Sequence, residues 1–281
     1  MHPVVVWSIG GYDVVVTSYR LMLFVSLLVV PGGALLLAAR RGLPWRRYLV
    51  VLAAAAAGAL VGARLLNATA STDWYLDDPE RLFHFGARGF SIFGGLALGG
   101  LAGWGACRAL RVEALRAADA LGPSLGVGIA LMRVGTFLAG SGYGTPTDLP
   151  WGVTFPAGSP AHVQQILEGG PFAALSGVQP VHPLQLYEAA AALAGAGFAW
   201  YLLQRRLPDG VAAAGLVAWY AGWRLLLHPM RAVMPGADVP DWFNPLLYAI
   251  VMVAAGGWAV ARVATKRRDE AMIQPSPVIG R

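Results

Sequence analysis

Long apolar runs separated by short polar connections dominate the chain. A membrane-spanning helix needs about 20 mostly apolar residues to cross the hydrocarbon core of a bilayer. Runs of this kind predict seven transmembrane helices, near residues 15–39, 48–67, 90–110, 117–139, 183–203, 211–230 and 244–264. The pattern therefore predicts an all-α integral membrane protein, with a single seven-helix domain over residues 1–265 and a disordered cytoplasmic tail over residues 266–281.

The connections between these runs alternate between basic and acidic. Cytoplasmic connections of membrane proteins carry an excess of Lys and Arg. The alternation therefore predicts a multi-pass protein with its N-terminus outside and its C-terminus in the cytoplasm. The basic connections hold Arg40, Arg41, Arg46, Arg47, Arg108, Arg111, Arg116, Arg205, Arg206, Lys266, Arg267 and Arg268, and the acidic ones hold Asp73, Asp77, Asp78, Glu80, Asp148, Glu168, Asp238 and Asp241.

The longest connection covers residues 140–182, between the fourth and fifth runs, and falls on the outer side in this topology. A connection of this length is usually either functional or disordered. It contains Trp151, Phe155 and Phe172, whose apolar area would be exposed to water in a disordered loop. We therefore expect an ordered outer, periplasmic head.

Composition supports a membrane protein and excludes several other classes. Charged residues make up 13% of the chain and apolar residues 57%, whereas soluble domains carry about 25% charged residues. The net charge of +6 does not predict binding to nucleic acid, because the basic residues lie in short clusters between apolar runs. The single cysteine, Cys107, excludes a disulfide within the chain, and we expect it to be a small packing residue.

Small residues are frequent within the apolar runs. Glycines spaced four residues apart allow two helix backbones to approach closely within a membrane. We expect most of these glycines to serve helix packing. They are Gly58, Gly62, Gly94, Gly95, Gly99, Gly100 and Gly103.

Ionisable residues inside the apolar runs are the best candidates for function. Charges inside a bilayer are costly, and they mark functional sites by default. Arg133, Arg224 and Glu188 lie within predicted helices, and Arg64 lies nearer the end of one. One interpretation is an internal ion pair between Glu188 and an arginine. The other is a pocket for phosphate, which the planar guanidinium binds with two charge-assisted hydrogen bonds.

The histidine pattern does not predict a metal site. His182 and His228 lie singly at the ends of apolar runs, and the chain has no H-E-x-x-H segment. No sequence feature ties Ser91 or Ser141 to a base, so the chain shows no serine nucleophile with a partnered histidine. We therefore expect no metal site.

Several segments in order along the chain resemble the prolipoprotein diacylglyceryl transferase family. Residues 182–188 read His-Pro-Leu-Gln-Leu-Tyr-Glu, similar to the family's HP-x-QLYE motif. Residues 133–137 resemble its Arg-x-Gly-Asn-Phe core, and residues 91–95 its Ser-Phe-His-Gly-Gly segment. Residues 220–224 and Tyr19 are similar to two further family positions. The resemblance covers residues 15–265.

This resemblance implies a reaction and a set of site residues. Family members transfer the diacylglyceryl group of phosphatidylglycerol to the thiol of a lipobox cysteine in a preprolipoprotein, in the bacterial inner membrane. The implied partners are phosphatidylglycerol, the lipobox peptide and membrane lipid, without nucleic acid, and we expect a monomer. The resemblance implies no cofactor. The candidate catalytic residues are Arg224, Glu188, His228 and Tyr19, and the candidate lipid-binding residues are Arg133, Ser91, Gly94, Gly95, His182, Gln185, Tyr187, Tyr220 and Arg231.

The chain departs from the family pattern at two informative positions. Phe93 replaces the family's His, and Thr136 replaces its Asn. Because Phe93 cannot accept a proton, we hypothesise that His228 acts as the base, since it follows Arg224 by four residues and would share its helix face. The alternatives are a divergent paralogue with another acceptor or lipid, a lipid-binding protein without chemistry, and a small transporter.

Overall fold

The computed structural model describes residues 4–9, 12–82, 90–169, 178–232 and 240–273. The chain divides into two compact units, which are described separately. The first unit contains residues 1–32 and 121–281, and the second contains residues 33–120. Two helices therefore contribute to both units: α1 (Ser18–Arg40) and α5 (Ala114–Leu138).

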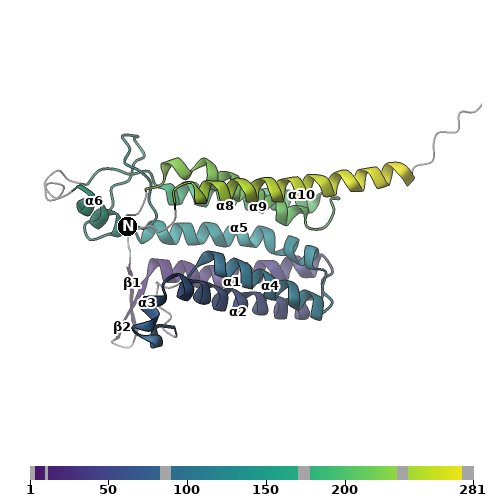
Figure 1. Ribbon diagram of the computed structural model, residues 1–281, viewed down its shortest axis with the longest axis horizontal. Coiled ribbons are helices and arrows are strands. Elements are labelled where there is room, and N and C mark those ends of the chain that lie inside the picture. Colours follow the sequence, from purple (N-terminus) through teal and green to yellow (C-terminus); the bar gives the residue numbers. More distant parts are fainter. Residues whose placement is uncertain (1–3, 10–11, 83–89, 170–177, 233–239, 274–281) are drawn as a thin grey trace, which may run out of the picture. The chain divides into compact units, whose positions relative to one another are not determined.

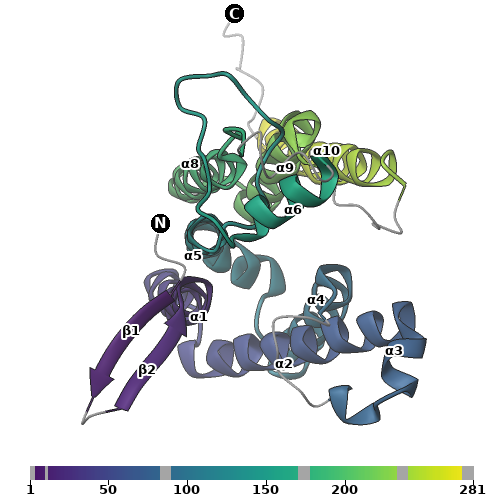
Figure 2. The ribbon, with the colours of Figure 1, turned by 90° about the vertical axis from the view of Figure 1, so that its left-hand side faces the viewer.

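The first unit is built mainly from long helices. Besides parts of α1 and α5, it holds β1 (Val4–Ile9), β2 (Tyr12–Thr17), α6 (Pro160–Gly169), α8 (Leu184–Gln204), α9 (Val211–Leu226), the short 3-10 helix η2 (His228–Met230) and α10 (Phe243–Ile273). Figures 1 and 2 show α8, α9 and α10 running side by side. The second unit holds α2 (Trp45–Ala70), α3 (Thr72–Leu76), the 3-10 helix η1 (Pro79–Leu82) and α4 (Ile92–Ala109).

The helices agree with the predicted apolar runs, but fewer of them qualify as membrane spans. Within the described ranges, five helices are long and apolar enough to cross a membrane, namely α1, α2, α5, α8 and α10. The other two predicted runs form α4 and α9, which have 18 and 16 residues. Glycines and a basic last turn lower the hydropathy of α4, and Pro229 helps to end α9 early because it disfavours helical backbone at His228.

The N-terminal residues form a hairpin that the prediction of an all-α chain missed. β1 and β2 pair antiparallel, from Val4 opposite Thr17 to Ile9 opposite Tyr12. The predicted first helix began at residue 15, but α1 begins at Ser18, after β2. Two valine-rich runs separated by Gly10 and Gly11 are a hairpin signal, because β-branched residues favour strands and glycines favour tight turns.

Small residues set the helix contacts in the first unit. A side chain at Gly126 of α5 would lie 2.8 Å from Cβ of Ala196 in α8, so the two backbones approach closely. The absence of a side chain at Gly195 makes room for Trp219 of α9. Small residues therefore let α5 approach α8 closely and let large side chains of α9, such as Trp219, pack against α8.

The second unit is held by a still closer contact. Gly62 of α2 and Gly94 of α4 face each other, and a side chain on either would overlap the other's carbonyl oxygen. Gly58 and Gly99 meet the partner helix in the same way. The prediction that these glycines serve helix packing is therefore confirmed for Gly58, Gly62, Gly94 and Gly99, whereas Gly100 has no atom within 4 Å of where its side chain would start.

The connection over residues 140–182 is ordered in the part that the structure describes. Phe155 is buried against Tyr143, Ala161 and Val181. Short backbone bridges join Pro146 and Val153 to Val181. Of the three aromatic residues named in the sequence, Phe155 is buried, Trp151 is exposed and Phe172 lies outside the described residues.

The last helix runs further than predicted. α10 continues to Ile273, so residues 266–273 are helical where a disordered tail was expected. Lys266 explains part of this difference, because it pairs with Glu270 one turn later and donates a hydrogen bond to the carbonyl of Arg206. Residues 274–281 lie outside the described residues.

Candidate functional site

A cluster of charged side chains in the first unit gathers around Glu188. Arg133 of α5 lies with its Nε 2.9 Å from Oε2 of Glu188, and Arg224 of α9 pairs with Oε1. Arg231, just after η2, reaches within 3.9 Å of Oε1. Arg133 precedes Glu188 by 55 residues and Arg224 follows it by 36, yet both bind its carboxylate, as the ion-pair interpretation expected.

The helices bring these residues together near their ends. Glu188 lies in the first turns of α8, whereas Arg133 and Arg224 lie in the last turns of α5 and α9. A buried apolar layer lies next to these charged residues, and it consists of Ala130, Ala189 and Ala192. These alanines allow α5 and α8 to approach closely enough for the longer charged side chains to meet.

Two tyrosines complete the contacts of the arginines. Nη2 of Arg133 donates a hydrogen bond to the Tyr220 hydroxyl at 3.2 Å. Nη2 of Arg224 donates to the Tyr248 hydroxyl at 2.8 Å. The sequence predicted Tyr220 as a site residue but missed Tyr248, which lies in α10 without any motif around it. An isolated tyrosine in an apolar run was the only signal available, because an unpaired buried hydroxyl is costly.

The cluster has more positive than negative charge. Among the described residues, three guanidinium groups surround one carboxylate, which leaves a formal excess of two positive charges. The side chain of Glu188 is 3% exposed, compared with 22% for Arg133, 12% for Arg224 and 37% for Arg231. The carboxylate is therefore enclosed, whereas two of the guanidinium groups remain accessible.

The excess positive charge of the cluster changes the pKa of Arg231. Burial, together with the positive charges of Arg224 and Arg133, lowers the pKa of Arg231 below its ordinary value, although Glu188 partly opposes the effect. A lowered pKa means that the cationic form is disfavoured in these surroundings. A bound anion would remove that penalty, so the arrangement favours an anionic ligand.

The loop after α5 is hydrogen-bonded to the segments that precede α8 and follow α9. Gly144 pairs with Arg231 in a short bridge, and its N–H donates to the carbonyl of His182. The N–H of Thr145 donates to the carbonyl of Met230. A side chain at Gly144 would lie 2.7 Å from both His182 and Met230. Gly144 therefore lets the loop hold the start of α8 and the end of α9 together.

The residues of the 182–188 segment divide between two roles. Tyr187 accepts a hydrogen bond from Nε1 of Trp151 at 2.8 Å and lies 3.3 Å from Nδ1 of His182. Gln185 is fully buried, and its amide donates to the carbonyl of Ser141. Among the described residues, the remaining oxygen of that amide has no hydrogen-bond partner. Gln185 thus anchors the loop after α5, with one acceptor left over.

The structure corrects the basis for predicting His228. The prediction required His228 and Arg224 to share a face of one α-helix, but α9 ends at Leu226 and His228 begins η2. Tyr19 lies in the first turn of α1 beside α5, where a side chain at Gly135 would lie 3.4 Å from its Cα. Tyr19 is therefore near the end of α5 that bears Arg133.

Three predicted site residues belong to the other unit. Ser91, Gly94 and Gly95 lie at the start of α4 in the second unit, as does Phe93. The N–H of Ser91 donates to the carbonyl of Ala63 in α2. Close helix packing explains why residue 94 is a glycine.

Arg64 in the second unit has local structural partners. Its Nε donates to the carbonyl of Leu82 at 2.9 Å, and its guanidinium lies over the rings of Phe90 and Tyr75. These contacts stabilise the Arg64 guanidinium near the end of α2.

In the described part of the chain, no three His, Cys, Asp or Glu side chains lie close enough to hold a metal ion.

Comparison with known proteins identifies the family. A family model described as prolipoprotein diacylglyceryl transferase matches residues 4–262. A phosphatidylglycerol–prolipoprotein diacylglyceryl transferase of Geobacter sulfurreducens is 34% identical over 200 residues, which are 69% of each chain. The enzyme of the same name from Zymomonas mobilis is 26% identical over 96% of this chain and 86% of its own. The one from Rhodococcus jostii is 29% identical over 98% of this chain and 77% of its own.

Proposed function

The chain belongs to the prolipoprotein diacylglyceryl transferase family, and we propose that it transfers the diacylglyceryl group of phosphatidylglycerol to the lipobox cysteine of a preprolipoprotein. The names of the relatives state both substrates, phosphatidylglycerol and a prolipoprotein. The cluster around Glu188 supports the same function, because its excess of positive charge suits a phosphate ester. The non-enzymatic and transporter alternatives are not favoured.

The proposed reaction is a displacement at carbon. The cysteine sulfur attacks the glyceryl carbon that bears the phosphate, a carbon–sulfur bond forms, and the carbon–oxygen bond breaks. Glycerol phosphate leaves with the bonding electron pair, and the thiol proton passes to a base. Because a thiolate is the reactive form of cysteine, both proton removal and stabilisation of the leaving phosphate accelerate the step.

The excess of positive charge in the cluster is the observation that best supports the proposed transfer from phosphatidylglycerol. We assign Arg133 and Arg231 to binding the phosphate, and Arg224 to stabilising the charge that develops on the leaving group. Fixed donors in a water-poor site are effective because they need little reorganisation as charge develops. Glu188 positions the guanidinium groups, since it binds all three while remaining enclosed.

The remaining predicted site residues are assigned by their place around the cluster. His182 and Tyr187 would contact the glycerol part of the lipid, Gln185 holds the loop after α5, and Tyr220 orients Arg133. His228 is the proposed proton acceptor. Its backbone carbonyl accepts a hydrogen bond from the N–H of Arg231, and this bond keeps His228 close to the cluster. Tyr19 remains a proposed catalytic residue, and Ser91, Gly94 and Gly95 remain proposed lipid contacts.

For topology, we propose seven spans in the bacterial inner membrane, with α4 and α9 as the two short ones. The N-terminus lies outside and the end of α10 in the cytoplasm, as the basic connections indicate. Residues 140–182 would then form a periplasmic head beside the arginine cluster, where a secreted peptide arrives. We further propose that the protein acts as a monomer.

The test is a transfer assay with the purified full-length protein in detergent. The protein is incubated with phosphatidylglycerol and a lipobox peptide, and mass spectrometry detects the added diacylglyceryl mass on cysteine. Arg133→Ala and Arg224→Ala should each lower the rate by about 10²–10³, the usual effect of removing one transition-state donor. Arg46→Ala, which removes an exposed arginine stacked on Trp45, serves as the matched control and should retain the rate.

Three results would change the proposal. Equal rates for the wild type and both cluster variants would remove the cluster from the reaction. Lipid binding by the wild type without any modified peptide would favour the lipid-binding alternative. His228→Ala with an unchanged rate would exclude that imidazole as the base.

A further inference from the structure

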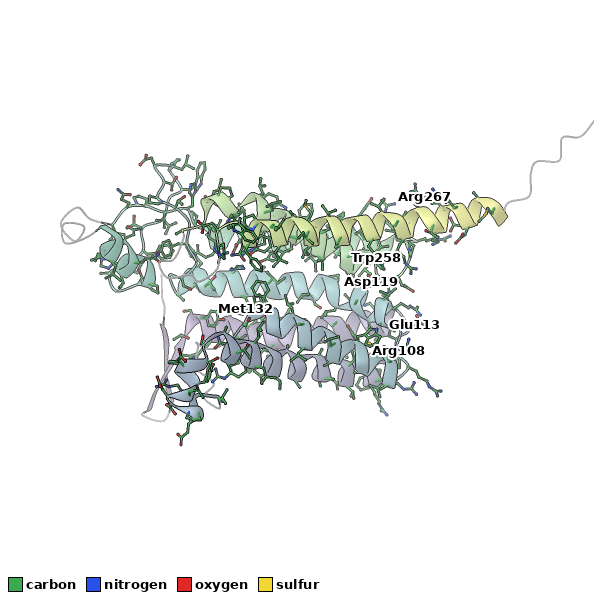
Figure 3. The ribbon with its side chains drawn as sticks, in the orientation of Figure 1. Arg108, Glu113, Asp119, Met132, Trp258 and Arg267 are labelled. Atoms are coloured by element: carbon green, nitrogen blue, oxygen red, sulfur yellow. The ribbon has the colours of Figure 1, made fainter. Side chains whose placement is uncertain are left out.

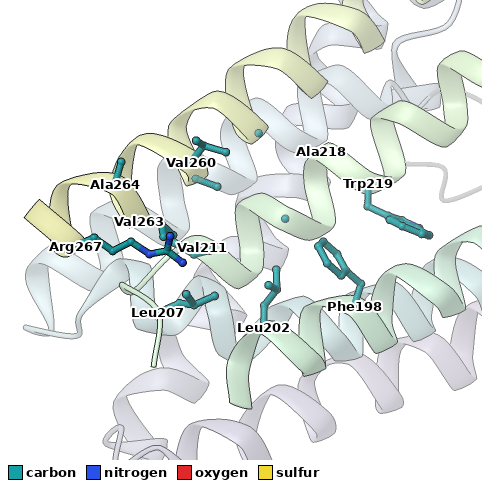
Figure 4. Close-up of a pocket in the computed structure, with 13 residues that line it drawn as sticks. Phe198, Leu202, Leu207, Val211, Ala218, Trp219, Val260, Val263, Ala264 and Arg267 are labelled. Atoms are coloured by element: carbon teal, nitrogen blue, oxygen red, sulfur yellow. The ribbon is translucent and has the colours of Figure 1, made fainter. Parts of the chain in front are cut away.

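An apolar groove lies on the first unit between α8, α9 and α10. Its volume is about 650 Å³, within the range of about 300–1,000 Å³ that small-molecule ligands occupy. Figure 4 shows Phe198 and Leu202 of α8 along one side and Val260 and Val263 of α10 along the other. A lining of this composition accommodates a hydrocarbon chain.

Arg267 is the single charged residue among those that line the groove. Figure 4 shows its side chain reaching from α10 towards Leu207 and Val211, while Trp219 lies at the other end of the groove. Among the described residues Arg267 has no hydrogen-bond or ion-pair partner, unlike Lys266 beside it, which pairs with Glu270. The groove thus combines an apolar channel with one unpaired cation at its end.

The position of Arg267 along α10 matches a lipid headgroup. At about 1.5 Å per residue, Arg267 lies about 36 Å along the helix from Phe243, slightly more than the about 30 Å of a bilayer's hydrocarbon core. Figure 3 shows Arg267 on the C-terminal part of α10 and Trp258 nearer the middle of that helix. A cation at the depth of Arg267 is typical of the membrane interface.

The groove is separate from the cluster around Glu188. Tyr248 contacts Arg224 near the start of α10, and Arg267 lies about 28 Å further along the same helix, again at about 1.5 Å per residue. On α8, Glu188 and Leu202 are separated in the same way, by about 21 Å. A phosphate beside Arg267 would therefore lie in the opposite leaflet from one at the cluster.

We propose that this groove is a binding site for an anionic phospholipid that is not the transferred substrate. One acyl chain lies between Phe198, Leu202 and Val260, and the phosphate pairs with Arg267. The proposal is independent of the catalytic one, because it requires only that the protein spans a membrane. Its consequence is selection of an anionic lipid over a neutral one at the face formed by α8, α9 and α10.

Photocrosslinking tests the proposal directly. The full-length protein is placed in phosphatidylcholine vesicles with a trace of phosphatidylglycerol that carries a diazirine in one acyl chain, and labelled residues are located by mass spectrometry. The matched probe is phosphatidylcholine with the same chain. We expect labelling of the groove by the anionic probe, and weaker labelling there by the neutral probe.

Two pairs of variants separate the parts of the site. Arg267→Gln should lower groove labelling by the anionic probe about fivefold, the effect of one interfacial arginine on an anionic lipid, whereas Arg268→Gln should not. Gly256→Leu should block the chain, because Gly256 lines the groove, whereas Gly257→Leu adds the same side chain in open space. Arg133→Ala should leave groove labelling intact, which separates this test from the catalytic one.

Several outcomes would overturn the proposal. Equal groove labelling by the neutral and anionic probes would show an unselective lipid contact. Unchanged labelling in Arg267→Gln would remove the headgroup contact. Crosslinks between two copies of the chain at the groove residues would assign the groove to a protein partner instead.

Discussion

Two helix contacts in this protein differ in the residues that form them, glycines in one and charged side chains in the other. α2 and α4 meet through glycines, with Gly62 and Gly94 so close that neither position has room for a side chain. The end of α5, the start of α8 and the end of α9 meet through Arg133, Glu188 and Arg224, and Arg231 joins them from the residues after η2. Glycine contacts need no charged residue to hold membrane helices together. Membrane helices can therefore pack without charged residues, so the presence of four charges in the second contact points to function.

The energetic balance of the two contacts also differs. Removing charges from water costs free energy that an ion pair only partly recovers. Four charges with an excess of two positive ones do not neutralise each other, so the cluster is not optimised for stability. A bound phosphate would complete it. The glycine contact, in contrast, is complete without a ligand.

Neutralising Glu188 should have the largest effect on stability. Glu188→Gln leaves three arginines without a counter-charge, and we expect a loss of about 3 kcal/mol, the lower end of the cost of breaking a buried ion pair. The free energy of unfolding is measured by titration with a denaturing detergent. Glu113→Gln is the matched control, because Glu113 pairs with Arg116 at an exposed site, where such a pair contributes less than about 1 kcal/mol. Equal losses in both variants would contradict a special role for Glu188.

A methyl group in the glycine contact should have the next largest effect. Gly94→Ala places Cβ against the carbonyl of Gly62, and we expect a loss of about 2 kcal/mol from overpacking. Gly100→Ala makes the same change in the same helix, where no atom lies within 4 Å, and should raise stability by up to about 1 kcal/mol. The melting temperatures of both variants in detergent provide the comparison. A stabilised Gly94→Ala protein would show that α2 and α4 can separate freely.

Removing one hydroxyl beside the cluster should have the smallest effect. Tyr248→Phe deletes the acceptor for Arg224, a contribution of about 1 kcal/mol, which corresponds to about a fivefold lower transfer rate. Tyr201→Phe is the control, because its hydroxyl accepts a hydrogen bond from Arg205 on an exposed turn. The rate is measured with the peptide assay. A wild-type rate for Tyr248→Phe would show that Arg224 does not depend on α10 for its orientation.

Sequence patterns predicted most helices because their cause is local. All seven apolar runs became helices, and six of them end within a few residues of their predicted bounds, since apolar length and helix formation are properties of each segment. The N-terminal hairpin was missed because its valine-rich runs were grouped with the apolar pattern of α1. The extent of α10 was missed because charged residues suggested a tail, although Lys, Arg, Glu and Ala also favour helix.

The site shows the same division. Arg133, Glu188 and Arg224 were identified from sequence, because ionisable residues in apolar runs are rare whatever the fold. Tyr248 was missed, because its role depends on α10 lying beside α9. The argument for His228 was wrong about the helix, because the α9 backbone changes before Pro229.

The amino-acid sequence by itself determined that this is a membrane protein of the prolipoprotein diacylglyceryl transferase family, where its helices lie and which charged residues are expensive to bury. Only the tertiary structure decided that three arginines share one carboxylate, that Tyr220 and Tyr248 hold two of them, and that an apolar groove ends at Arg267. The physical reason is distance. Hydropathy acts within a segment, whereas an ion cluster or a groove requires segments far apart in sequence to be packed together.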